Sequence, residues 1–521
     1  MPLAVKITYL GHAGFCVEDD RSVIVMDPWL SPEGAFDSAW FQFPPNGHMA
    51  EFVADRLADS SRERFVYVSH EHHDHFDLGF LERLTSRDFT LVIPHFRRAT
   101  LLEQLAGYRC RRLAALTDRE RIPFGGGWLR LYLDDSSPNR DSALLVRMGD
   151  KTFFNMNDCK LFDRIDEVRE DAGTLDVFAC QFSGATWHPT CYQYEGTRYA
   201  AISKQKSFAK FESVARAIER LEPATYVPSA GPPCFLDPEL YHLNFEASNI
   251  FSRFEKLEFY LKRRLRKTNV ELANLGPGGT IDVAGDRAAV VAGPTVAESE
   301  HAGLVESYAK SRRELFNGHR TLSPSAVEET LARLRLEFAK KLASLSLANR
   351  VDVPLYFALR EREDVAVKVD FHSRTTTLTQ ERRPEEFYEL VAPAWQVRRV
   401  LEGALTWEEF SLTFRVRIRR NPDIYQPVIH AFLLMDADDL AQWCAALEAL
   451  EARQERIAVT CDGREYSVLR YCPHQGGDLA QGWMEGNHLV CPRHHWRFDI
   501  TRGGTCTSTG ASIEAIAPGL E

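Results

Sequence analysis

The chain has 521 residues, of which 44% are hydrophobic and 26% charged, and its formal net charge is −11. This length predicts two to four globular domains, and the acidic balance argues against binding to nucleic acid or to an anionic membrane surface. The sequence contains no apolar run long enough to cross a bilayer. Its eleven cysteines are odd in number and scattered along the chain. We therefore expect a cytoplasmic protein in which cysteines are free thiols or metal ligands rather than disulfides.

The first part of the chain is predicted to alternate strands and short helices. Apolar and polar residues alternate over residues 4–19, and Ser22–Met26 is an apolar run that ends at Asp27. A period of two is typical of strands, so these segments predict an opening hairpin. Further along, the pattern predicts a helix at 99–105 and strands at 91–94, 128–133, 142–148 and 152–158.

The densest group of potential metal ligands follows an apolar strand at 64–69. It reads His70-Glu71-His72-His73-Asp74-His75. Side chains two residues apart point the same way at the end of a strand, so His70 and His72 can hold one ion while Asp74 and His75 reach a second position. A polar surface loop with chance histidines is the alternative, but H-x-H-x-D-H directly after a buried strand is a specific pattern.

This pattern resembles the metal-binding signature of the metallo-β-lactamase fold, and the resemblance implies an αββα sandwich. The segments Gly11-His12-Ala13 and Asp27-Pro28-Trp29 resemble those of one branch of this family. That branch contains ascorbate-6-phosphate lactonases and N-acyl-phosphatidylethanolamine phospholipases. We therefore expect an N-terminal metallo-β-lactamase-like domain with a metal site.

The same resemblance implies that Asp158, at the end of the strand 152–158, bridges two metal ions. A helix N-cap is the alternative role, because a helix follows this residue. Two histidines that are usual in the family are missing, and this leaves the number of metal ions open. The residues that are candidates to replace them are Asp134, Asp135, His188 and His242.

The middle of the chain is predicted to be a mixed α/β segment. Residues 246–267 and 325–347 are predicted to form helices, and residues 365–371 alternate as in a strand. Four arginines of one run either bind a phosphate or carboxylate group or form a solvated basic face: Arg415, Arg417, Arg419 and Arg420.

A second set of metal ligands lies near the C-terminus. Cys472-Pro473-His474 is followed, after sixteen residues, by Cys491-Pro492-Arg493-His494. Two thiolates and two imidazoles in this order are the ligand set of a Rieske [2Fe–2S] cluster, in which Cys472 and Cys491 hold one iron and His474 and His494 the other. Zinc uses the same residue types, but the glycine-rich turn and the strand at 496–499 are similar to Rieske domains.

The two predicted centres together indicate a redox enzyme. A metallo-β-lactamase-like site alone suggests hydrolysis by a metal-activated water, but a hydrolase has no use for the single electrons that a Rieske cluster carries. Histidine and carboxylate ligands suit non-haem iron as well as zinc. We therefore expect one or two non-haem iron ions that activate O2 with electrons from the [2Fe–2S] cluster.

The combination resembles the cytidine monophosphate-N-acetylneuraminate hydroxylases, which join the same two domains, although in that family the Rieske domain comes first. The likeness extends more weakly to residues 407–409 and 415–425. It implies a Rieske-coupled monooxygenase that hydroxylates or otherwise oxidises an organic substrate, with an amino-sugar or sugar nucleotide as one candidate. The alternatives are an O2 or NO reductase of flavodiiron type and a metal-dependent hydrolase with an accessory Rieske module.

The sequence has no strand–G-x-G-x-x-G–helix unit for a nicotinamide cofactor. We therefore expect a separate electron donor, such as a ferredoxin, a cytochrome or an NAD(P)H-dependent reductase. The other expected partners are O2 and a small-molecule substrate, for which an anionic group is one possibility. The expected domains are a metallo-β-lactamase-like domain at 1–245, a helical and mixed α/β connecting segment at 246–450 and an all-β Rieske domain at 451–521.

Overall fold

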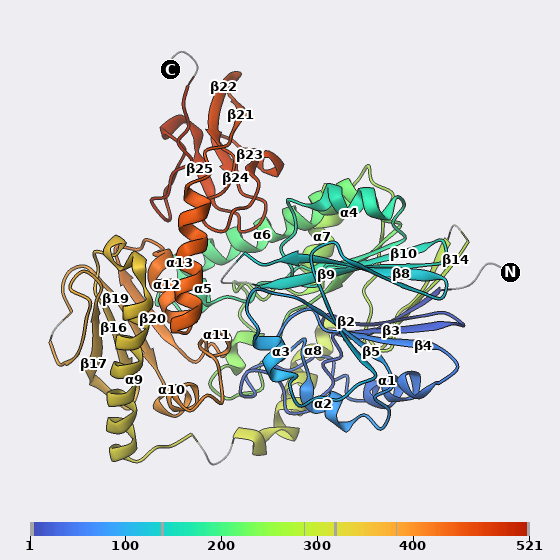
Figure 1. Cartoon of the computed structure of the whole chain (residues 1–521), viewed down its shortest axis with the longest axis horizontal. Coiled ribbons are helices and arrows are strands. Elements are labelled where there is room, and N and C mark those ends of the chain that lie inside the picture. The colour runs from blue at the N-terminus through green and yellow to red at the C-terminus, as the bar shows by residue number, and fades with distance from the viewer. Residues whose placement is uncertain (1–4, 137–139, 286, 317–319, 382, 518–521) are drawn as a thin grey trace. The chain divides into compact units, whose positions relative to one another are not determined.

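The computed structural model describes residues 5–136, 140–285, 287–316, 320–381 and 383–517 (Figure 1). The chain divides into two compact units. The first comprises residues up to 135, 139–185 and 203–315, and the second comprises 136–138, 186–202 and the chain from 316 onward. Within the described residues, none of the helices is both long and apolar enough to cross a membrane.

Two β-sheets, of eight and seven strands within the described residues, form the centre of the first unit. In sheet order, the first consists of β15 (Arg287–Val291), β14 (Thr280–Ala284), β1 (Val5–Gly11), β2 (Gly14–Glu18), β3 (Ser22–Met26), β4 (Glu63–Tyr67), β5 (Thr90–Pro94) and β6 (Arg112–Leu116). The second consists of β13 (Glu271–Leu272), β12 (Thr225–Ser229), β11 (Val177–Gln181), β10 (Lys151–Asn155), β9 (Asp141–Met148), β8 (Gly127–Asp134) and β7 (Arg121–Phe124). The helices of this part of the chain are α1 (Met49–Ala58), α2 (Leu78–Arg83), α3 (Thr100–Gln104), α4 (Ile165–Ala172), α6 (Gly196–Leu221), α7 (Phe254–Arg264) and α8 (Glu298–Ser311).

Alternation along the strands builds four layers, which Figure 1 shows as helices on both sides of two facing sheets. In β3, Ile24 and Met26 enter the core between the sheets, whereas Val23 and Val25 enter the core shared with α1, α2 and α3. On the other side, Phe178 of β11 packs in the core that includes α4, α6 and α7. This αββα sandwich confirms the fold predicted for the N-terminal part.

The first unit continues beyond the boundary expected at residue 245. The reason is strand pairing: β13 adds to β12, and β14 pairs with β1 with Ile7 opposite Ile281. The helix predicted over 246–267 is shorter, because the side chain of Asn249 accepts a hydrogen bond from Phe251 N and donates one to Leu243 O. Such local side-chain bonds compete with a helix, and α7 begins only at Phe254.

The second unit contains a five-stranded sheet among its described residues, in the order β18 (Thr375–Thr379), β17 (Arg362–Asp370), β16 (Leu355–Leu359), β19 (Phe387–Ala392) and β20 (Arg417–Asn421). Its helices are α5 (Trp187–Thr190), α9 (Pro324–Ser344), α10 (Ala394–Leu401), α11 (Trp407–Leu412), α12 (Pro427–Leu434) and α13 (Ala437–Glu451). The segment 186–202 joins this sheet at its β20 edge, because Gln193 N donates to Ile418 O (3.0 Å) and Ile418 N donates to Cys191 O (2.8 Å).

The described part of the chain from Arg456 onward contains short antiparallel strands. They form a pair, β21 (Arg456–Cys461) and β22 (Arg464–Leu469), and a sheet of β23 (Trp483–Glu485), β24 (His488–Val490), β25 (Arg497–Asp499) and β26 (Thr505–Cys506). Val468, Phe498 and Ile513 are fully buried in their common core. This β-rich architecture confirms the fold predicted for the C-terminal domain.

Candidate functional site

The four predicted cluster ligands lie on two loops of the C-terminal domain. Cys472 N donates to Gly477 O (2.9 Å), which closes the first loop. The Cys472 and Cys491 side chains are 1% and 0% exposed, and the rings of His474 and His494 lie 4.6 Å apart. A Cβ atom added to Gly477 would lie 3.0 Å from Cys491 Sγ. Two buried thiols, two adjacent imidazoles and a glycine where a side chain would intrude fit a [2Fe–2S] cluster.

Aromatic rings cover part of the His474 imidazole. The Trp496 ring stacks on it at 4.5 Å with an angle of 10° between the planes. Tyr425, from the segment between β20 and α12, meets the same imidazole edge-on at 5.9 Å, and its backbone N donates to Ser508 O (2.9 Å). The His474 imidazole therefore contacts both Trp496 of the C-terminal domain and Tyr425 of the α/β segment.

The predicted metal ligands of the first unit come together where β4 and β10 end. His70 Nε2 lies 2.9 Å from His72 Nδ1. His75 Nε2 lies 3.3 Å from Asp158 Oδ1 and 3.8 Å from Asp74 Oδ2. One ligand atom each of His70, His75 and Asp158 fall within 4.8 Å of one another, which is close enough to bind a common ion.

Two buried carboxylates orient these histidines from behind. Asp27 Oδ2 lies 2.9 Å from His75 Nδ1, and Asp141 Oδ1 lies 3.1 Å from His70 Nδ1. A histidine that donates its Nδ1 proton to a carboxylate presents the unprotonated Nε2 to a metal ion. Asp27 and Asp141 thus have the position that carboxylates commonly take behind metal-binding histidines.

The electrostatics of this site show a cluster of buried carboxylates that requires positive charge. Burial by itself raises a carboxyl pKa, yet His75 and His70 hold the pKa of Asp158 well below its usual range. Burial lowers the pKa of His75, but Asp158 and Asp74 outweigh it and raise the pKa to about 9. Protons on the histidines therefore balance the carboxylates, and a metal cation would take over that role.

The structure tests whether the donor atoms fit a metal ion. Among the described residues, Asp74 Oδ1, His75 Nε2 and Asp158 Oδ1 are buried and have no hydrogen-bond partner. Native proteins rarely leave buried polar atoms unsatisfied. Imidazole and carboxylate donors that converge in this way fit zinc or non-haem iron.

Sequence reasoning missed three residues of this site: His12, Asp27 and Asp141. His12 Nε2 lies 3.0 Å from Asp74 Oδ2. The available signal for His12 and Asp27 was their place at strand ends in the first hairpin. For Asp141 the signal was register, since it lies opposite Asp134 in the β8–β9 pair.

Of the four residues named as replacements for the missing histidines, the structure places three in other contacts. Asp135 pairs with Arg97, and His242, whose side chain is 62% exposed, pairs with Glu246. His188 lies in the second unit, where its Nε2 is 3.0 Å from the Tyr194 hydroxyl. Asp134, the fourth, is buried.

The arginine run of the second unit is largely neutralised by its own neighbours. Arg417 pairs with Glu363 and Arg419 with Glu389. Arg420 Nε donates to Asp423 (2.7 Å). These pairs favour a structural role over capture of a substrate anion.

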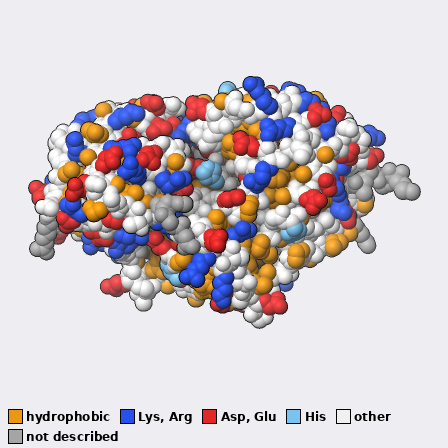
Figure 2. Space-filling model, turned by 90° about the horizontal axis from the view of Figure 1, so that it is seen from below, with side chains coloured by type: hydrophobic (Ala, Val, Ile, Leu, Met, Phe, Trp, Pro, Cys, Tyr) orange, Lys and Arg blue, Asp and Glu red, His pale blue; other side chains and the backbone are white. Residues whose placement is uncertain are grey.

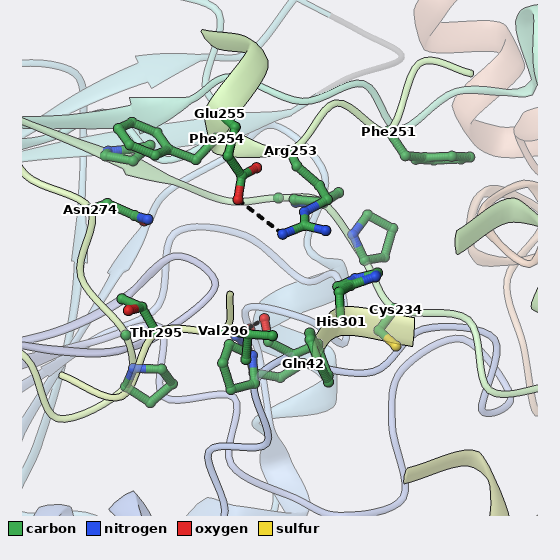
Figure 3. A pocket seen from close by; sticks show the side chains of 18 of the residues that line it. Gln42, Cys234, Phe251, Arg253, Phe254, Glu255, Asn274, Thr295, Val296 and His301 are labelled. Carbon is green, nitrogen blue, oxygen red and sulfur yellow. Dashed lines mark hydrogen bonds and ion pairs between the residues drawn. The ribbon is translucent and has the colours of Figure 1, made fainter. Parts of the chain in front are cut away.

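The first unit contains a cavity of about 150 Å³. Its wall includes Tyr9, whose hydroxyl donates to His12 O (2.9 Å). Figure 3 shows Arg253 paired with Glu255 on one side of the cavity. Asn274 lies on another side of it. Its lining residues offer cationic, anionic and amide groups but include none of the predicted metal ligands.

Comparison with known proteins identifies the family. The Rieske [2Fe-2S] domain family matches residues 431–515, and the beta-lactamase superfamily domain matches residues 6–128. A Rieske 2Fe-2S iron–sulfur protein of Mycolicibacterium smegmatis is 30% identical over 532 residues, which cover 98% of this chain and 99% of that protein. The chain belongs to this family of Rieske 2Fe-2S iron–sulfur proteins.

Two further relatives place this Rieske protein in context. A Rieske 2Fe-2S iron–sulfur protein of Mycobacterium tuberculosis is 29% identical over 539 residues, which cover 99% of this chain and 100% of that protein. The cytidine monophosphate-N-acetylneuraminic acid hydroxylase of Xenopus laevis is 22% identical over 445 residues, which cover 81% of this chain and 70% of that enzyme. The similarity to both therefore extends well beyond a single domain.

Charged side chains of both signs lie on the surface of the Rieske protein. Figure 2 shows acidic and basic side chains intermixed over one face of the molecule. The net charge of −11 belongs to the whole chain.

Proposed function

We propose that this Rieske protein is a Rieske-coupled non-haem iron monooxygenase that oxidises a small organic anion. The observation that carries the proposal is the convergence of buried, unsatisfied imidazole and carboxylate atoms at His75, Asp74 and Asp158 in a chain that also has a Rieske domain. When bound, non-haem iron supplies O2 activation and the [2Fe–2S] cluster supplies single electrons. The similarity to enzymes named as hydroxylases supports this assignment.

We assign a role to each of three sets of residues. His70, His72, Asp74, His75 and Asp158 are the proposed ligands of the non-haem metal. In the C-terminal domain, Cys472, His474, Cys491 and His494 are the proposed ligands of the cluster. Behind the first set, Asp27 and Asp141 hold the Nδ1 protons of two histidines and fix their orientation.

Lys210 is the proposed binding group for the anionic part of the substrate. Its Nζ donates to Gln181 Oε1 (2.7 Å), at the end of β11, and the side chain of Asp158 is 22% exposed. Burial, with a contribution from Lys160, lowers the pKa of Lys210 to about 8. The amine therefore remains protonated at neutral pH and, among the described residues, has no carboxylate partner within ion-pair distance.

Metal analysis is the first test. Protein purified without oxygen is expected to contain the two iron and two sulfide ions of the cluster and additional iron that disappears in His72→Ala. The exposed His48, changed to alanine, is the matched control. Zinc in place of the additional iron would favour the metal-dependent hydrolase.

Oxygen consumption is the second test. Chemically reduced protein is mixed with O2 and cytidine monophosphate-N-acetylneuraminate, the first probe because of the named relatives. Substrate-dependent O2 uptake with an oxygenated product is expected. Equal uptake without any organic substrate would favour an O2 reductase, and cluster electrons that never reach product would refute the coupling.

A further inference from the structure

His12 occupies a turn that holds it firmly at the edge of the metal site. It lies between β1 and β2, and its side chain is buried between the rings of Trp29 and His75, each 5.3 Å away. Its carbonyl oxygen accepts hydrogen bonds from the Tyr9 hydroxyl and from Ala230 N, both at 2.9 Å. Two elements far apart in the sequence therefore fix the backbone of this one residue.

The backbone of this turn is strained at His12. His12 has φ of 50°, in the left-handed region that side chains other than glycine avoid. The preceding Gly11 has φ of 110°, and a Cβ there would lie 2.8 Å from Asn46 Nδ2. Strain of this kind concentrates at functional sites. The turn thus accepts an unfavourable conformation that aims the imidazole at Asp74.

The contact with Asp74 is not a satisfactory hydrogen bond. His12 Nε2 is 3.0 Å from Asp74 Oδ2, yet within the described residues Nε2 is among the buried atoms without a hydrogen-bond partner. Asp74 Oδ1, His75 Nε2 and Asp158 Oδ1 share this condition. An unsatisfied buried polar atom costs about 1–3 kcal/mol, so four of them in one site fit a place where a cation binds.

The loop after β12 supports the His12 backbone but supplies no histidine of its own. Residues 229–233 read Ser-Ala-Gly-Pro-Pro and include no imidazole or carboxylate. This loop contributes Ala230 N, which holds His12 O in place. One ligand atom each of His12, Asp74 and His75 lie within 4.8 Å of one another. This group shares His75 with the group of His70, His75 and Asp158, but His12 and Asp74 belong to it alone and so mark a second binding position.

We propose that His12 is a direct ligand of a second metal ion, which it binds together with Asp74 and His75, so that the non-haem site holds two ions. This inference rests on the proposed function for the identity of the metal as iron, but the ligand role itself applies to any divalent transition metal. The alternative is that His12 only positions Asp74 by a hydrogen bond and touches no metal.

Cobalt(II) binding tests the ligand role, because cobalt takes imidazole and carboxylate ligands and its visible absorption reports the ligand set. Protein stripped of the non-haem metal, with the cluster intact, is titrated with cobalt. The wild type is expected to bind two ions per chain and His12→Gly one, because glycine suits the positive φ but offers no donor. His48→Ala, an exposed histidine of the same unit, should bind two.

Two further measurements separate ligation from positioning. Added imidazole should restore the second ion and its absorption band in His12→Gly. His12→Phe, which keeps a ring between Trp29 and His75, should remain at one ion, and the Rieske absorption should persist in every variant as evidence of folding. Two ions with an unchanged cobalt spectrum in both His12 variants would overturn the proposal. Failure of substrate oxidation in a wild type that binds two ions would instead refute the proposed function.

Discussion

Replacement of Lys341 should stabilise the second unit, and the gain should depend on pH. Lys341 lies on α9 and is fully buried. Its Nζ is 4.4 Å from the ring centroid of Trp407 and 5.1 Å from that of Phe432. Among the described residues Nζ has no hydrogen-bond partner. Burial lowers its pKa to about 7, although Glu337 and Asp436 oppose the shift.

The magnitude follows from this difference in pKa. A folded-state pKa of about 7, against an ordinary value of 10.5, corresponds to about 5 kcal/mol of preference for the neutral amine. We therefore expect Lys341→Met, which keeps the length of the side chain without the charge, to raise the free energy of unfolding by up to about 5 kcal/mol near pH 6.

The sign of the pH dependence is fixed by proton binding. Between the folded and unfolded pKa values the unfolded chain binds more protons at Lys341, so the stability of the wild type rises with pH in that window. The advantage of the variant should shrink by about 1.4 kcal/mol per pH unit above about pH 7. Below that pH the penalty is fully present in the wild type.

Urea unfolding followed by hydrogen exchange of α9 peptides measures this effect in the relevant unit. Peptides from α1, which belongs to the first unit, provide the internal reference and should not change. A variant that is less stable than the wild type near pH 6 would refute the reasoning. It would mean that Trp407, Phe338 and Phe432 form a favourable aromatic cage for the ammonium.

Two further predictions concern the sites. Cys472→Ala or His494→Ala should abolish the visible Rieske absorption and EPR signal while the first unit stays folded, and a normal spectrum in either variant would contradict the ligand assignment. Lys210→Met should raise the apparent KM for an anionic substrate roughly 10- to 100-fold, since a hydrogen bond to a charged group contributes about 1.5–3 kcal/mol. In that oxygen-uptake assay Lys204→Met, an exposed lysine of the same helix, is the control, and equal KM values would exclude the anion role.

Local motifs indicated most residues of the two candidate sites, because these residues are close together in sequence. The His70–His75 run and the two cysteine–histidine loops each fix their geometry within a few residues. His12 and Asp27 were not predictable in this way, since their approach to His75 depends on the order of strands in the first sheet. Asp141 was missed because its nearness to His70 depends on two strands of different sheets.

The fold was predictable where periodicity is strong and less so at boundaries. The apolar run of β3 and the alternation in β17 identified strands, whereas the end of the first unit depends on β13 and β14, whose pairing partners lie more than 40 residues earlier in the chain. The shortened α7 reflects a side-chain hydrogen bond of Asn249 that composition does not reveal. Long-range pairing and local polar competition are therefore the two effects that sequence periodicity leaves undetermined.

The path of the chain limits how this protein can be dissected. The segment 186–202 belongs to the second unit, although residues before and after it belong to the first. A fragment that ends near residue 315 would carry the Cys191–Gln193 edge without β20, its hydrogen-bonding partner. The complementary fragment would expose the Ile418 edge of its sheet. Expression of either half alone should therefore yield a protein with an open strand edge that is prone to association. The proposed roles of the metal site and of the cluster are therefore better tested one at a time by point substitution than by truncation.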